Sequence, residues 1–354
     1  MHWQIWIDTG GTFTDCIAIS PVGQVQRIKV LSSSCLRGRL LERVGPAIFR
    51  ISHNWPAGAD IFSTYAFRVL GQRHPPAQVV RCALDEGLLQ LSVDFNPRLP
   101  ASFEITAGEE APVLATRLAT STPLNADMPN VQMRLGTTRG TNALLERKGA
   151  RAALVVTRGF GSLLLIGAQQ RPHLFQLDIP APKPLYELAL QAEERLDASG
   201  NILQPLNEST VENMVGRIRE SGVEAVAVAF LHAYRNPVHE LQLGRALKRA
   251  GMPFVSLSHQ LSPSIKLLPR AQTAMANAYL APIMESYLGN IRSKLGDGHR
   301  LHVMSSAGGL AEASLFHPKD SLLSGPAGGV VGAAAIARQL GYDSILTLDM
   351  GGTS

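Results

Sequence analysis

The amino-acid sequence predicts an α/β fold with a mixed sheet, and three observations support that prediction. Short apolar stretches typical of strands occur from one end of the chain to the other. In the second half they alternate with stretches whose apolar residues have the spacing of amphipathic helices. A loop with two adjacent glycines follows the apolar stretch at 4 to 7 and again the one at 345 to 348. Alternating strands and helices favour a parallel or mixed sheet with helices on its faces.

Three strands are expected near the N-terminus, at 3 to 7, Cys16–Ser20 and Val25–Val30, with a turn at 21 to 23. Residues 31 to 130 are harder to interpret. Partly helical spacing suggests helices at Arg37–Phe49 and Pro76–Leu91.

Beyond these residues the pattern is clearer. The apolar run Ala152–Thr157 predicts a buried strand, and the four prolines between 171 and 184 predict extended backbone. The turn Ser199-Gly200-Asn201 suggests a boundary between two domains, 1–200 and 201–354. Further strands are expected at Val223–Phe230, Phe254–Leu257, Leu301–Ser305 and Ile345–Leu348. Helices are expected at Glu208–Ser221, at 238 to 250, after an N-cap at Ser262-Pro263, through the stripe Met284, Tyr287, Leu288, Ile291 and Leu295, and at Gly325–Leu340.

The composition is that of a globular protein, with 45% hydrophobic and 17% charged residues. The net charge is +5, but the basic residues form no long run, so a solvated surface is favoured over a nucleic-acid partner. Cys16, Cys35 and Cys82 fit no metal or disulfide spacing, which favours the cytoplasm. Neither a signal peptide nor a membrane-spanning stretch is expected.

The strongest internal signal is a repeat: Ile7–Thr12 closely matches Leu348–Thr353. Adjacent glycines lack Cβ atoms, so backbone N–H groups can approach phosphate oxygens, and threonine hydroxyls add donors. The aspartates can hold Mg²⁺ or its waters. The residues predicted to bind the phosphates of ATP are Gly10, Gly11, Thr12, Thr14, Gly351, Gly352 and Thr353, and the predicted catalytic acids are Asp8, Asp15 and Asp349, with Asp8 holding Mg²⁺ through water. The alternative is that both loops are ordinary tight turns.

Two such loops facing each other would hold a triphosphate from both sides. That arrangement is the one in the actin-like ATPase fold, a ribonuclease H-like fold shared by sugar kinases and heat-shock chaperone ATPases, here with an incomplete second half. The chain has no GxxxxGK[ST] motif, which disfavours a P-loop enzyme. Ala327 stands where a GxGxxG motif would need glycine, so a Rossmann fold is also disfavoured.

Several segments resemble, in order, those of the hydantoinase/5-oxoprolinase family. The longest are Ile7–Asp15, Gly136–Gly149 and Thr157–Leu177. Shorter matches are Glu194-Arg195, Phe230–His232, Asn236–Glu240, Ser258-His259, Asn277–Pro282, Ser305–Gly309 and Ser324–Gly329. The chain is therefore similar to the N-terminal, ATP-binding, hydantoinase A-like portion of the family, and Thr157–Leu177 is closer to 5-oxoprolinase than to hydantoinase. Residues 50–100 fit the family poorly.

The resemblance implies ATP- and Mg²⁺-dependent opening of a cyclic amide, most simply 5-oxo-L-proline to L-glutamate, a reaction of glutathione metabolism. It also implies a hydantoinase B-like hydrolytic half or subunit as a partner. The family continues its second loop with Thr-Asp-Val, whereas this chain ends at Ser354, so a truncated subunit with little activity alone is expected. Alternatives are a subunit of a hydantoin or other lactam hydrolase, an actin-fold small-molecule kinase, or a non-catalytic, partner-dependent fragment.

Other polar residues have two interpretations. Thr137, Thr138, Arg139, Thr141 and Asn142 could line the substrate site, or Thr141 or Asn142 could cap a helix. Gln170 and Arg171 could contact the substrate carboxylate or a phosphate, or form a structural pair. His232, His239 and His259 lack metal-ligand spacing and are expected to be structural. Gly325–Gly329 could bind an anion at a helix N-terminus or allow close packing.

Overall fold

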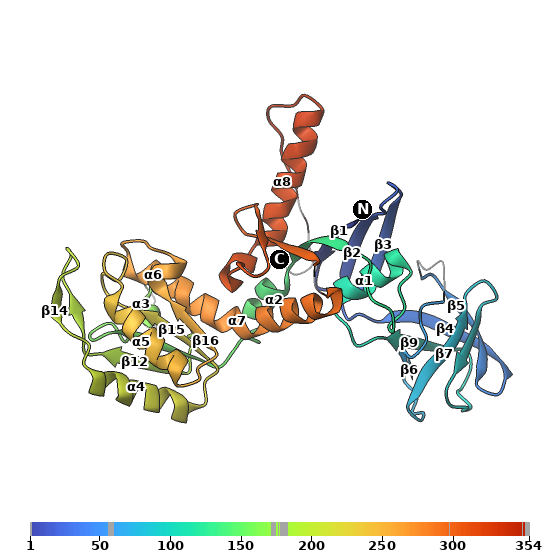
Figure 1. Cartoon of the computed structure of the whole chain (residues 1–354), viewed down its shortest axis with the longest axis horizontal. Helices are drawn as coiled ribbons and strands as arrows, with labels where there is room; N and C mark the ends of the chain where they lie inside the picture. Colours follow the sequence, from blue (N-terminus) through green and yellow to red (C-terminus); the bar gives the residue numbers. More distant parts are fainter. Residues whose placement is uncertain are drawn as a thin grey trace. The chain divides into compact units, whose positions relative to one another are not determined.

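The computed structural model describes residues 2–55, 60–170, 175, 177, 183–296, 298–348 and 350. The chain forms two compact units (Figure 1). Unit 1 comprises Met1–Arg139, Ser286–Phe316 and Asp320–Ser354, and unit 2 comprises Gly140–Glu285 and His317–Lys319. Gly200 lies inside unit 2, and a division into domains at this residue stays a prediction.

Unit 1 is built on a six-stranded mixed sheet in the order β18-β17-β10-β1-β2-β3. Its strands are β1 (Trp3–Thr9), β2 (Phe13–Ile19), β3 (Val25–Leu31), β10 (Val131–Thr137), β17 (Arg300–Met304) and β18 (Leu310–Glu312). β2 is antiparallel to both β1 and β3, whereas β1, β10 and β17 are parallel. The strands expected near the N-terminus and at Leu301–Ser305 are thus present.

Alternation of side chains gives this sheet one buried face. Ile5 and Ile7 of β1 and Met133 and Leu135 of β10 are buried, and the residues between them are more exposed. The helix α1 (Ala111–Thr120), almost entirely buried, contacts β1, β2 and β3. A second helix, α8 (Ser324–Gln339), contacts β10 and β17 and coincides with the helix expected at Gly325–Leu340.

Between β3 and α1 the chain forms a closed six-stranded barrel in the order β4-β5-β8-β7-β6-β9. Its strands are β4 (Leu36–Gly45), β5 (Ile48–His53), β6 (Ala66–Val69), β7 (Ala77–Ala83), β8 (Leu88–Leu91) and β9 (Ala101–Thr106). The helices suggested at Arg37–Phe49 and Pro76–Leu91 are therefore wrong. Register shifts between Leu40 and Glu42 and between Val79 and Arg81 break the two-residue alternation that would have identified strands.

Unit 2 contains a four-stranded parallel sheet in the order β12-β11-β15-β16. Its strands are β11 (Ala152–Thr157), β12 (Leu188–Ala192), β15 (Ala225–Ala229) and β16 (Phe254–Leu257), and a short hairpin pairs β13 (Arg195–Leu196) with β14 (Ile202–Gln204). The accompanying helices are α2 (Arg139–Leu145), α3 (Leu163–Ile166), α4 (Glu208–Ser221), α5 (Val238–Arg249) and α6 (Ser258–Leu261). The helix α7 (Leu267–Leu295) and the 3-10 helix η1 (Pro318–Ser321) begin in unit 2 and end in unit 1.

The apolar patterns of unit 2 predicted its elements well. Every residue of β11 and of β15 is buried, as in a sheet covered on both faces. The helix α4 has the predicted bounds, and its buried residues Val211, Met214 and Ile218 share one side. The stripe from Met284 to Leu295 is buried within α7, as expected, and most of it belongs to unit 1.

Two predicted elements differ from the structure. Ser262-Pro263 caps no helix, because α6 ends at Leu261 and α7 begins only at Leu267. Ile345–Leu348 forms no regular secondary structure, and the Leu346 and Leu348 side chains are fully exposed. An apolar strand needs a hydrogen-bonded neighbour, and no other described strand pairs with this segment. Most of the predicted extended segment at 171–184 lies outside the described residues.

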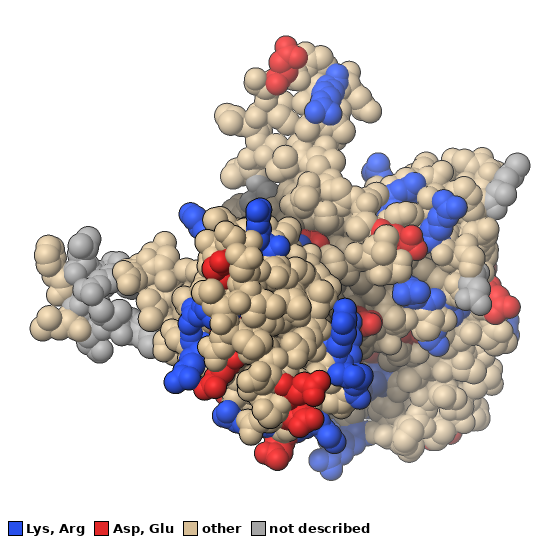
Figure 2. Space-filling view, turned by 60° about the vertical axis from the view of Figure 1, so that its left-hand side comes forward, with Lys and Arg blue, Asp and Glu red and all other residues tan. Residues whose placement is uncertain are grey.

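On the face shown in Figure 2, acidic and basic side chains are intermixed, in keeping with the solvated surface expected from the composition. None of the helices in the described part of the chain combines the length and hydropathy required to cross a membrane.

Candidate nucleotide and substrate site

The first glycine loop is the tight turn between β1 and β2. The Gly10 amide donates to the Phe13 carbonyl (3.0 Å), and Ser32 Oγ donates to the Gly10 carbonyl (2.8 Å). Thr14 is buried, and its Oγ1 lies 3.0 Å from Ser32 Oγ. Gly11 and Thr12 are exposed. Thr14 therefore supports the turn, and the loop offers its backbone at Gly11 and the Thr12 side chain to a ligand. The sequence analysis missed Ser32, which no motif marks.

Asp8 and Asp15 lie directly opposite each other on β1 and β2. Both are exposed, and two like charges in this position repel each other. Lys29 Nζ offsets one of them, since it lies 2.8 Å from each carboxylate oxygen of Asp15. Lys29 is a second residue that the sequence analysis missed; its place opposite Asp15 follows only from the register of β2 and β3.

A glycine leaves room for the Asp8 carboxylate. A Cβ atom at Gly136 would lie 3.3 Å from Asp8 Oδ1, closer than most real Cβ contacts. Asp8 on β1 and Gly136 on β10 are opposite each other in the sheet. The carboxylate therefore lies against the backbone of the neighbouring parallel strand.

The end of β10 is tied to the end of β1. The Thr138 amide donates to the Thr9 carbonyl (2.9 Å), and Thr138 Oγ1 donates to the same oxygen (3.2 Å). Thr137 is fully buried, and its carbonyl accepts a hydrogen bond from Ser324 Oγ (3.1 Å) at the start of α8. These bonds bring three separate stretches of sequence to one edge of the sheet.

Arg139 lies over the ring of Tyr287, with its guanidinium carbon 4.8 Å from the ring centroid. Its Nη1 is 3.3 Å from Glu110 Oε2, and 44% of its side chain remains exposed. Tyr287 is 1% exposed, and its hydroxyl donates to Thr9 Oγ1 (3.4 Å). Burial raises the pKa of Tyr287 to about 12, so the hydroxyl stays protonated. The sequence analysis identified Tyr287 only as a core residue.

A pocket of about 640 Å³ lies beside these residues in unit 1. Asp8, Asp15 and Gly136 line it from the sheet, and four glycines line it from α8: Gly325, Gly328, Gly329 and Gly332. The first turn of α8 borders this pocket, and free N–H groups at a helix N-terminus favour anions. Anion binding and close helix packing, the two predicted uses of Gly325–Gly329, both stay predictions.

The other predicted site residues lie in α2, at the surface or outside the described residues. Thr141 is buried and Asn142 half-buried within α2, which begins at Arg139; neither therefore caps this helix, and that alternative is wrong. Gln170 is exposed. Arg171, Asp349, Gly351, Gly352 and Thr353 lie outside the described residues. Whether the two glycine loops share one nucleotide is thus a proposal.

Two histidines belong to a buried hydrogen-bond network in unit 2. His239 Nδ1 lies 2.7 Å from Glu194 Oε2, and His259 Nδ1 lies 2.6 Å from Glu240 Oε2. Glu240 also accepts a hydrogen bond from the Phe230 amide (2.9 Å). The described residues contain no group of three or more His, Cys, Asp or Glu side chains that could together hold a metal ion. The contacts of His239 and His259 with buried glutamates favour their structural interpretation. His232 lies next to the network, and its Nδ1 is buried without a partner in the described structure.

Two family models match this sequence. The model of the hydantoinase/oxoprolinase N-terminal region matches residues 4–55 and 105–251, and the hydantoinase/oxoprolinase model matches 270–354. The unmatched stretch between 55 and 105 contains β6, β7, β8 and most of β9, in agreement with the poor family fit expected at 50–100.

Curated proteins similar to this chain include two 5-oxoprolinases and a caprolactamase subunit. The 5-oxoprolinase of Saccharomyces cerevisiae is 37% identical over 263 residues, which is 64% of this chain and 20% of the relative. The 5-oxoprolinase 1 of Arabidopsis thaliana is 38% identical over 245 residues, 63% of this chain and 19% of the relative. Caprolactamase subunit alpha of Pseudomonas jessenii is 33% identical over 230 residues, 62% of this chain and 33% of that subunit. The chain thus spans about a fifth of the length of the two 5-oxoprolinases.

Two solved structures share the fold. Nucleotide-free acetone carboxylase aligns with a TM-score of 0.63 at 19% identity, over 96% of this chain and 41% of that one. ATP-dependent caprolactamase from Pseudomonas jessenii aligns with a TM-score of 0.62 at 24% identity, over 99% and 42%. Together with the mixed sheet of unit 1, this likeness confirms the predicted actin-like α/β fold class. The family models match most of the sequence, and the chain belongs to the hydantoinase/oxoprolinase family.

Proposed function

We propose that this chain is the ATP-binding part of an enzyme that opens a cyclic amide at the expense of ATP. The observation that carries the proposal is the junction of the first glycine loop with the Thr137–Arg139 stretch, held together at Thr9. The names of the curated relatives favour 5-oxo-L-proline as the substrate and L-glutamate as the product. The caprolactamase relative favours a different lactam as the second candidate.

The chemistry explains why ATP is needed. A lactam carbonyl is a poor electrophile, so its oxygen first attacks the γ-phosphorus of ATP and ADP leaves. Water then adds to the activated carbon, and the C–N bond breaks with protonation of the nitrogen. Hydrolysis of the resulting acyl phosphate releases L-glutamate and phosphate. The protein must hold phosphate and lactam in line for the first step.

In this proposal the backbone N–H group at Gly11 and the Thr12 hydroxyl bind the phosphates, and Gly10 lets the phosphates approach the loop because it has no side chain. Asp8 and Asp15 present oxygen ligands opposite each other, a donor set that fits Mg²⁺ through its waters. Mg²⁺, when bound, would neutralise phosphate charge. Asp349 and its glycine loop would supply the second half-site.

Arg139 is proposed to orient an anionic group of the substrate, because its guanidinium is both fixed by Tyr287 and partly exposed. The other proposed substrate residues are Thr137, Thr138, Asn142, Gln170 and Arg171.

The later hydrolytic steps are assigned to a hydantoinase B-like partner, a proposal supported by the subunit name of the caprolactamase relative.

The proposed compartment is the cytoplasm, as expected from the sequence. Free thiols at Cys16, Cys35 and Cys82 are compatible with it.

Calorimetric titration with Mg-ATP, with and without 5-oxo-L-proline, tests the proposal. We expect saturable ATP binding that the lactam strengthens. A folded protein that binds no ATP would contradict the proposal. A stable phosphorylated product with an intact ring, in the presence of the partner, would favour a kinase instead.

A further inference from the structure

Unit 2 contains a pocket of about 540 Å³ that has no part in the proposed phosphate chemistry. Its walls come from α2, α3, the segment 183–186 and α7. Most of the wall is apolar: Leu144, Leu145, Leu164, Leu185 and Met275. Leu145 is 62% exposed, so a large apolar side chain faces solvent beside the pocket. A volume of this size with a mainly apolar lining is typical of small-molecule sites.

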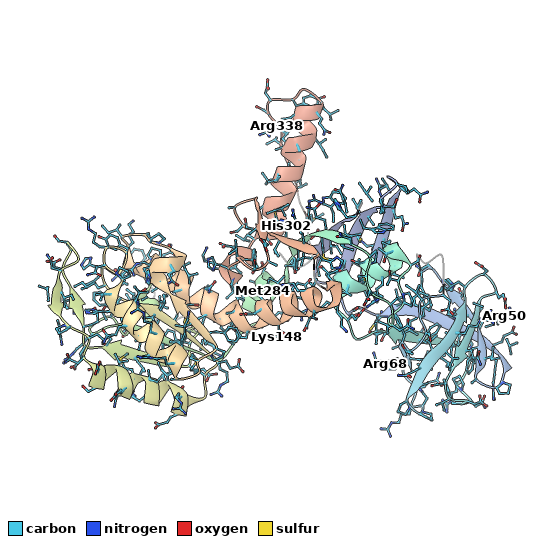
Figure 3. The ribbon with its side chains drawn as sticks, in the orientation of Figure 1. Arg50, Arg68, Lys148, Met284, His302 and Arg338 are labelled. Carbon is cyan, nitrogen blue, oxygen red and sulfur yellow. The ribbon has the colours of Figure 1, made fainter. Side chains whose placement is uncertain are left out.

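Two cations border the same pocket. Arg147 and Lys183 both line it, and Arg147 Nη1 donates to the Lys183 carbonyl (3.1 Å), which fixes the guanidinium beside the opening. The neighbouring acid does not neutralise them: Glu146 pairs with Lys148 at 2.6 Å, and Lys148 is labelled in Figure 3. Among the described residues that line the pocket, none is acidic. The polar rim therefore favours a negative charge.

We infer that this pocket binds a small organic monoanion with an apolar body, such as a medium-chain carboxylate. The carboxylate pairs with Arg147 and Lys183, and the carbon chain contacts the leucines and Met275. A neutral apolar molecule would leave both cations without a counter-charge. The inference does not depend on the proposed reaction.

Calorimetric titration of the full chain with octanoate tests the inference, with octanamide as the neutral ligand of the same shape. We expect one octanoate per chain and binding of octanamide weaker by about tenfold, because it lacks the charge. Arg147→Met and Lys183→Met should each weaken octanoate binding by about five- to tenfold.

Arg249→Met is the matched control, since Arg249 ends α5 and does not line the pocket. This variant should bind octanoate like the wild type. Circular dichroism spectra confirm that each variant is folded. Absence of octanoate binding to the wild type would overturn the inference. Equal binding of octanoate and octanamide, or octanoate binding unchanged by both cation substitutions, would overturn it as well.

Discussion

The hydroxyl of Tyr287 donates a hydrogen bond to the hydroxyl of Thr9, across 3.4 Å and from residues that are far apart in the sequence. The same ring supports the guanidinium of Arg139. A helix thereby contacts both strand ends that form the proposed site. This contact links the packing of α7 to the geometry of the phosphate loop.

Tyr287→Phe removes the hydroxyl and keeps the ring under Arg139. We expect Mg-ATP to bind about two- to fivefold more weakly, because one hydrogen bond to Thr9 is lost. Titration calorimetry measures the effect. Tyr279→Phe is the matched control, because Tyr279 is also buried on α7 but lies in unit 2 next to Gly149. Equal ATP affinities for Tyr287→Phe and the wild type would remove Tyr287 from the site.

Gly136→Ala tests the contact between β10 and Asp8. The added methyl group would lie 3.3 Å from Asp8 Oδ1, so the carboxylate must move. We expect Mg-ATP affinity to fall by about tenfold, since small displacements of a positioning group have large effects. The control is Gly216→Ala in α4, where an added Cβ meets no atom within 4 Å. That change should leave ATP binding unaltered and stabilise the helix by about 0.5–1 kcal/mol.

Glu109→Gln tests a buried ion pair in unit 1. Arg117 Nε lies 2.7 Å from Glu109 Oε2, and the two side chains are 4% and 2% exposed. Removing the carboxylate charge leaves Arg117 buried and unpaired, which should cost about 3–5 kcal/mol of unfolding free energy. Urea denaturation measures this loss.

The control for this pair is an ion pair at the protein surface. Arg50 and Glu42 form an ion pair on the barrel with side chains that are 47% and 60% exposed. Glu42→Gln should change the unfolding free energy by less than about 1 kcal/mol. Similar losses for the two variants would show that burial of Glu109 and Arg117 has no energetic consequence.

The stability of the barrel should depend on pH through Glu104. Burial alone would raise the pKa of Glu104, but hydrogen bonds from Arg68 (labelled in Figure 3) and Arg37, together with their charges, lower it overall. A depressed folded-state pKa stabilises the fold above the unfolded value of about 4.3, and this contribution is lost as pH falls through the folded value. Both arginines are largely exposed, so the contribution is modest.

Urea unfolding of the wild type and Glu104→Gln at pH 7 and near pH 3.5 checks this dependence. At pH 7 the variant should be less stable by about 1 kcal/mol or less. The difference should shrink toward the acidic end, because the stabilisation from a depressed pKa is lost as pH falls from the unfolded value toward the folded value. A difference that grows on acidification would contradict the assignment.

The sequence by itself determined the parts of the fold that depend on local pattern. The apolar runs of β11, β15 and β16 and the amphipathic spacing of α4 identify these elements. Burial of one helix face requires apolar residues at a regular spacing, and burial of both faces of a strand requires a continuous apolar run. The glycine loop after β1 was equally visible, because two adjacent glycines at the end of an apolar strand predict a tight turn, and the structure has one there. Motif order was sufficient to indicate the family, which the family models confirm.

Only the tertiary structure decided which distant residues meet. The barrel escaped prediction because bulges at Leu40 and Val79 interrupt the alternation of its strands, and its closure depends on pairing between β4 and β9. Ser32, Lys29 and Tyr287 carry no motif, and they reach the proposed site through strand register and helix packing. Hydrogen bonds and charge pairs act over a few ångströms in space, whereas a sequence records only separation along the chain.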